Sequence, residues 1–108
     1  MNFKELAHNF DSGPSGTDQF KILYRGAQQL MKLEPENAAL YFVISVAAQA
    51  YVMRYEDQAV EPALAERAKA IMVDFNRRVV SALDGDASER LRAANTVAMD
   101  YEWHVPDF

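Results

Sequence analysis

Residues 37–53 read NAALYFVISVAAQAYVM, and from Ala38 onward only Ser45 and Gln49 interrupt this apolar run. A helix that is apolar on nearly every side has to be surrounded by the rest of the protein. About twenty residues at ~1.5 Å each form a rod of roughly 30 Å, which is the diameter of a small domain. The sequence therefore predicts a central helix over residues 36–57, inside a compact helical protein.

The segments on both sides of this run have the spacing of amphipathic helices. In residues 17–33 and 62–84, apolar side chains recur at i, i+3, i+4 and i+7, while charged side chains take the other side. Short segments rich in turn-forming residues separate the helices, and such connections make consecutive helices antiparallel neighbours. We predict one all-α domain over residues 1–108, a compact up-down bundle of four main helices with a short N-terminal helix. The expected helices are 2–10, 17–33, 36–57, 62–84 and 86–103.

Local features support several of these boundaries. Asn2 and Glu5 have the spacing of a helix-capping box, and Gly85 suits the left-handed position that ends many helices. In the last helix, the side chains expected to face inward are Leu91, Ala94, Ala98 and Tyr101, with Val97 beside them.

One junction has a local resemblance. Leu33–Ala38, followed by Tyr41, resembles the junction between consecutive tetratricopeptide repeats, and the likeness ends after about ten residues because the helix from Asn37 is too long for such a repeat. We interpret the match as a shared way of joining two helices.

Composition narrows the classes of partner. Sixteen acidic against eleven basic side chains give a net charge of -5, which repels nucleic-acid phosphates, so we expect no nucleic-acid partner. The apolar part of the central run falls short of the ~20 residues that a bilayer needs, so we expect no membrane partner. The first residues lack a basic segment followed by an apolar stretch, which favours a cytoplasmic protein.

The residues that carry chemistry do not form a complete catalytic or metal-binding set. The chain has no cysteine, so it lacks disulfides, thiolate metal sites and a cysteine nucleophile. Glu5 and His8 have the spacing of one di-iron ligand pair, but such bundles need two pairs and two further carboxylates. We therefore expect no enzyme activity, no metal and no cofactor.

Two acidic segments are the candidate partner-binding sites. Glu56 and Asp57 oppose the dipole at the end of the central helix, and a broken local rule is often compensated by function. The end of the chain combines acids with tyrosine and tryptophan, the residue types that dominate binding hot spots. We predict a small acidic, non-catalytic module that binds and modulates a partner protein, as inhibitor, immunity or antitoxin-like proteins do. The predicted partner is basic or apolar at its contact surface, and the predicted binding residues are Glu56, Asp57, Glu61, Tyr101, Glu102, Trp103 and Phe108.

Two further hypotheses concern the central helix. Tyr41, Ser45 and Gln49 lie at i, i+4 and i+8, where they could line a pocket of a small-molecule-binding bundle or mark the least buried side of the helix. The apolar excess also predicts a homodimer, because monomers seldom leave large apolar patches exposed and two-fold contacts bury them. We expect its interface at the C-terminal tail or on the Tyr41 side of the central helix.

Overall fold

The computed structural model describes residues 1–104, and over that range it is an all-α bundle without strands. The predicted all-α bundle is therefore confirmed. α2 begins and ends where the apolar spacing predicted, and the other helices lie within two residues of their expected bounds. The helices are α1 (Phe3–Ser12), α2 (Thr17–Leu33), α3 (Ala38–Tyr55), α4 (Pro62–Leu83) and α5 (Ala87–His104), and the short 3-10 helix η1 (Pro35–Asn37) joins α2 to α3.

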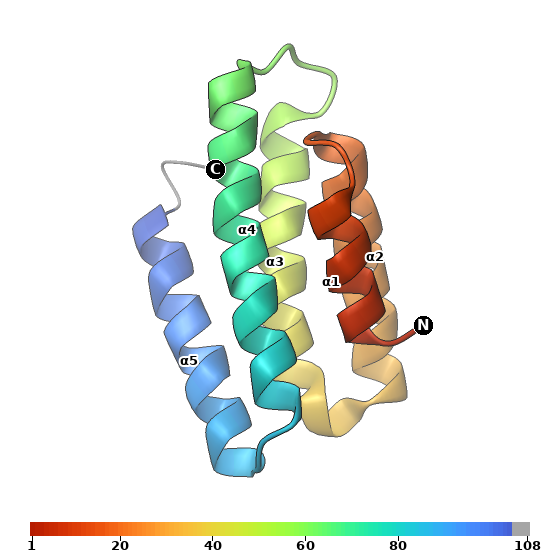
Figure 1. Ribbon diagram of the computed structural model, residues 1–108, viewed down its shortest axis with the longest axis vertical. Coiled ribbons are helices and arrows are strands. Elements are labelled where there is room, and N and C mark those ends of the chain that lie inside the picture. Colours follow the sequence, from red (N-terminus) through yellow and green to blue (C-terminus); the bar gives the residue numbers. More distant parts are fainter. Residues whose placement is uncertain (105–108) are drawn as a thin grey trace.

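The central run forms α3, and α2, α4 and α5 all pack against it (Figure 1). The pairing of α2 with α3 is the most extensive in the molecule, because the η1 turn lets one helix return along the other. α1 packs against α2 and α4, and α5 packs against α3 and α4. The short N-terminal helix is thus one corner of the bundle, while α5 lies along one edge of it.

Aromatic side chains connect α1, α2 and α3 in the core. The ring of Phe20 stacks on that of Tyr51 with centroids 4.1 Å apart, and Phe10 meets Phe20 edge to face at 5.0 Å. Phe3 lies 5.5 Å from the ring of Tyr41. The apolar side of α1 is fully engaged in the core, so this helix contributes to the stability of the bundle although it is short.

The close approach of α1 to α2 depends on Gly26. A Cβ atom placed on Gly26 would lie 2.8 Å from both methyl carbons of Leu6, which is closer than real Cβ contacts. The missing side chain therefore leaves the space that the buried Leu6 occupies.

One local expectation of the sequence is confirmed and one is wrong. The backbone N–H of Glu5 donates to Asn2 Oδ1 at 2.8 Å, as the capping pattern predicted. Gly85 does not have a positive φ; α4 ends instead with a tight turn in which the Gly85 N–H donates to the Ala82 carbonyl at 2.9 Å. The one non-glycine residue with a positive φ in the described range is Asp57, at 63°.

The orientation of α5 also differs from the expected one. Leu91 is 60% exposed and Ala98 is exposed, whereas Val97 is fully buried and Ala94 is nearly so. The small side chains Ala94 and Val97 let α5 approach α3 and α4 closely, and this contact sets the rotation of the helix. Leu91 then lies at the edge of the contact rather than inside it.

By length and composition alone, the segment Pro35–Tyr55 is apolar enough to cross a membrane, a property that core helices of small proteins share. In this structure 44% of the apolar window is buried by the other helices.

Candidate interaction surfaces

Glu56, Asp57 and Glu61 lie in the connection between α3 and α4 and are all exposed. Glu56 forms an ion pair with Lys21 of α2, and the hydrogen bond in this pair raises the pKa of the Lys21 ammonium group above its ordinary value. Glu61 precedes Pro62 at the start of α4, where a carboxylate suits the helix dipole. Of the three predicted binding residues, Asp57 is therefore the one that still departs from the usual placement of charges at helix ends.

The predicted binding residues at the end of α5 differ in how deeply they are buried. Tyr101 is half-buried against the core, and burial, with a smaller effect of the nearby Glu102, raises the pKa of its hydroxyl. Glu102 and Trp103 are exposed, and Trp103 is 81% exposed. Phe108 lies outside the described residues.

The two acidic segments do not form one surface. The end of α5 is level with the middle of α4, because the rings of His104 and Phe75 have centroids 6.4 Å apart. Phe75 follows Pro62, the start of α4, by about 20 Å along the helix axis. In addition, Asp100 is engaged by Arg78 of α4, with Oδ2 2.5 Å from Nη1. The acids after α3 and those of α5 are thus separate groups.

A second large apolar side chain accompanies Trp103. Met99 is 64% exposed and lies one helical turn before Trp103, on the same side of α5. We refer to Met99 and Trp103 as the α5 patch. The sequence prediction missed Met99, although its i, i+4 spacing to Trp103 was visible.

The polar residues of α3 do not converge on one pocket. Tyr41 is 1% exposed and its hydroxyl donates to Glu34 Oε1 at 2.9 Å; burial, followed by this hydrogen bond, raises the pKa of Tyr41 far above its ordinary value. Ser45 is buried and donates to the Phe42 carbonyl at 2.9 Å. Ser45 and Gln49 line a groove of about 350 Å³ between α2 and α3, together with Gln28, Met31, Lys32, Phe42 and Val46.

Tyr41 lies apart from that groove. It lines a different hollow of about 280 Å³ beside α1, whose other lining residues include Asn2, Lys4 and Asp84. The small-molecule hypothesis therefore has two of its three predicted residues in one place.

The expectation that the central helix is surrounded on all sides is wrong for one side of α3. Phe42 is 54% exposed and Met53 is 79% exposed, and Ala39 is exposed as well. The neighbouring helices cover the sides of α3 that carry Leu40, Ile44 and Tyr51 and leave this side uncovered.

Within residues 1–104, no group of three or more His, Asp or Glu side chains is placed to hold a metal ion. Comparisons of the chain with protein-family models, with curated proteins and with solved structures found no match.

Proposed function

We propose that this chain is a small acidic, non-catalytic protein-interaction module that binds and modulates a partner protein, in the manner of an inhibitor, immunity or antitoxin-like protein. The observation that carries the proposal is the α5 patch. Two large apolar side chains stand exposed one turn apart, and one of them is the residue type most enriched in binding hot spots. Their desolvation by a partner would contribute to the affinity of binding.

The charge around the patch defines the partner's chemistry. Glu102 is exposed beside Trp103, and the whole chain carries a net charge of -5. An apolar pocket with a basic rim on the partner would complement this surface, and the opposite charges would speed association at low salt. We therefore propose a partner that is apolar at its centre and basic at its edge, in the cytoplasm.

The test uses the immobilised protein as bait for a cytoplasmic extract at low salt, beside the variants Trp103→Ala and Leu33→Ala. Leu33 is a matched control, because it is also largely exposed but lies at the end of α2. We expect a basic protein that the wild type and Leu33→Ala retain, that Trp103→Ala loses, and that rising salt releases.

The captured protein is then purified and mixed with the chain in solution. Trp103 is the one tryptophan of the sequence, so the chain's own tryptophan fluorescence reports on this surface alone, and the fluorescence of the partner measured by itself is subtracted. Protection of Trp103 from acrylamide quenching on mixing is expected. Equal retention by Trp103→Ala and wild type, or unchanged quenching in the mixture, would contradict the proposal.

A further inference from the structure

The uncovered side of α3 carries a regular row of side chains, which we call the α3 stripe: Ala39, Phe42, Val46, Gln49 and Met53. The spacing of the row is three, four, three and four residues, which is the a and d spacing of helices that pair along their length. The row extends over about 21 Å of the helix. Phe42 and Met53 are mostly exposed and Val46 and Gln49 are half-buried, so this pairing seam is not used inside the monomer.

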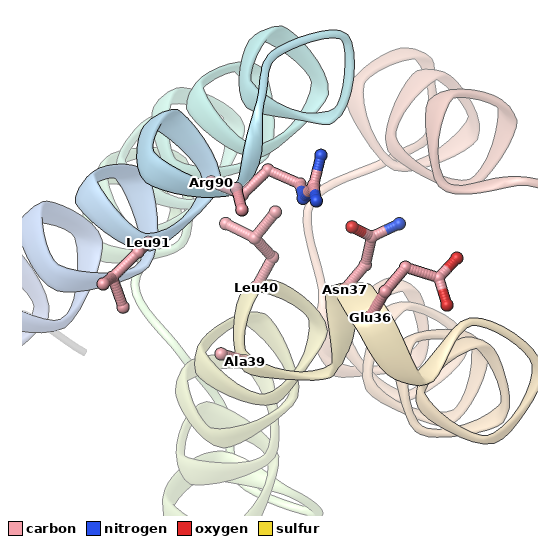
Figure 2. A pocket seen from close by; sticks show the side chains of 7 residues that line it. Glu36, Asn37, Ala39, Leu40, Arg90 and Leu91 are labelled. Atoms are coloured by element: carbon pink, nitrogen blue, oxygen red, sulfur yellow. The ribbon is translucent and has the colours of Figure 1, made fainter.

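A groove flanks the α3 stripe on each side. The groove of about 350 Å³ between α2 and α3 has Phe42, Val46 and Gln49 on one wall and Met31 on the other. Apolar cavities of about 150 Å³ can already hold a benzene ring, so this groove has room for a phenylalanine or methionine side chain. On the other side, a smaller hollow of about 140 Å³ lies between the start of α3 and α5. Figure 2 shows its lining, which includes the apolar Ala39, Leu40 and Leu91 and the charged Glu36 and Arg90.

The large side chains of the stripe are complementary in size to small side chains on the same side of α3. In an antiparallel pairing centred on Val46, Ala39 lies opposite Met53 of the second copy, and Phe42 lies opposite Ala50. Each large side chain thus meets a small one. In a parallel pairing, Phe42 would meet Phe42 and Met53 would meet Met53. The stripe therefore fits a second antiparallel α3 better than a parallel one.

Charge and area also suit a second copy. The α3 stripe and the residues that line the larger groove include no carboxylate, although acids outnumber bases in the chain. The centre of the contact therefore places no acids opposite one another. At its two ends Glu36 of one copy lies opposite Glu56 of the other, and Glu56 is already paired with Lys21 of its own monomer. The molecule measures 41 × 28 Å along its two longer axes, so it is large enough for the ~800 Å² per partner that stable interfaces bury.

We propose that the α3 stripe is the contact of an antiparallel, two-fold homodimer in which each copy places Phe42 and Met53 against small residues of the other. This contact differs from the predicted interface on the Tyr41 side of α3, because Tyr41 is buried within its own monomer. It is also independent of the α5 patch.

The first test is sedimentation equilibrium of the wild type, Phe42→Glu and Met99→Glu over a range of micromolar concentrations. Both substitutions place a carboxylate on an exposed apolar site, so Met99→Glu is the matched control. We expect a dimer for the wild type and Met99→Glu, and a dissociation constant raised on the order of a hundredfold or more for Phe42→Glu. Circular dichroism checks that both variants remain helical. A wild type of monomer mass throughout, or equal loss in both variants, would overturn the proposal.

The second test uses the absence of cysteine from the chain. Val46→Cys should form a disulfide-linked dimer under mild oxidation, whereas Ser81→Cys, exposed on α4, should not. A mixture of Ala39→Cys and Met53→Cys should cross-link between the variants. Neither should cross-link to itself, because identical positions would lie about 21 Å apart and a disulfide needs Cα atoms within about 7 Å.

Self-cross-linking of Met53→Cys would overturn the antiparallel arrangement. Flotation of a monomeric wild type with phosphatidylcholine vesicles, lost in Phe42→Glu, would assign the α3 stripe to a lipid surface and overturn the dimer.

Discussion

Asp57 is a residue whose backbone conformation and charge both oppose the local structure. Its φ of 63° lies in the left-handed region, which costs an L residue other than glycine about 1 kcal/mol or more. Its carboxylate also lies just after α3, where the Gln58 N–H returns to the Tyr55 carbonyl at 3.1 Å and the helix dipole is negative. The position is one where a helix commonly places glycine.

Asp57→Gly is therefore expected to raise the free energy of unfolding by about 1 kcal/mol, since it removes both the strain and the unfavourable charge. Asp57→Asn, which removes the charge and keeps the shape, should raise it by only a few tenths of a kcal/mol. Urea unfolding followed by circular dichroism measures both values. A loss of stability in Asp57→Gly would show that the carboxylate makes a stabilising contact in the native state.

The burial of Tyr41 predicts that the stability of the protein falls at high pH. Burial and the hydrogen bond to Glu34 raise the pKa of its hydroxyl in the folded state above the ordinary value of about 10. The resulting stability is fully present below pH ~10 and is lost as the pH rises further, because the unfolded chain then releases a proton that the folded one keeps. At pH 11 this loss is at most about 1.4 kcal/mol.

Tyr41→Phe should lower stability at pH 8 by about 1 kcal/mol, through loss of the hydrogen bond, yet lose less stability than the wild type between pH 8 and 11. Urea midpoints of both proteins at the two pH values provide the comparison. The pKa values of Tyr51 and Tyr101 are also raised by burial, but these residues are present in both proteins, so their effect cancels. An equal fall in both proteins would contradict the prediction.

At the scale of elements, the contact of α1 with α2 is the place where the bundle is most sensitive to size. Gly26→Leu should lower the free energy of unfolding by about 1–3 kcal/mol, because the new side chain overlaps Leu6. This loss is expected although leucine is the better helix former by about 1 kcal/mol. Urea unfolding gives the change, and hydrogen exchange of the α1 amides shows whether the helix detaches.

The control combines Gly26→Leu with Leu6→Ala, so that the large and the small side chain change places. Leu6→Ala alone should also destabilise the protein, since it empties part of the core. If the overlap causes the loss in Gly26→Leu, the double variant is more stable than the sum of the two single effects predicts. Additive effects would show that the two positions do not share the same space.

The helices differ in how much of their structure could be predicted from the sequence. The bounds of α2 could be predicted from its apolar spacing, because a helix with one solvent-exposed side repeats its pattern of apolar and polar residues at every turn. The rotation of α5 did not, because its inward side consists of small residues and the larger Leu91 suggested a different side. α3 is apolar all round, so its pattern could not show which side the other helices leave uncovered.

Some features of the candidate sites could likewise be predicted from the sequence, and others could not. Trp103 was predicted from its residue type near a charged chain end, and the structure leaves it exposed. The pairing of Glu56 with Lys21 could not be predicted, because it joins residues from α2 and the end of α3 that only the folded bundle brings together. The separation of the two acidic segments likewise depends on where α5 ends beside α4.

At the scale of the whole molecule, the α3 stripe and the α5 patch lie on different sides. Leu91 marks the side of α5 that borders α3, because it lines a hollow together with Ala39. Thr96 marks the side that borders α4, where it lines a groove with Arg78. Trp103 follows Thr96 by two helical turns and so lies on the α4 side. A dimer formed through the α3 stripe therefore leaves Trp103 in solvent.

This arrangement predicts that Trp103→Ala leaves the sedimentation behaviour of the protein unchanged, whereas Phe42→Glu yields a monomer. It also predicts that acrylamide quenches Trp103 equally well above and below the concentration at which the dimer dissociates, because the indole remains exposed in both states. If the C-terminal tail formed the contact instead, quenching would fall as the dimer forms and Trp103→Ala would weaken it. Partner binding at the α5 patch should then protect Trp103 in Phe42→Glu as fully as in the wild type, because the partner needs only one copy of α5.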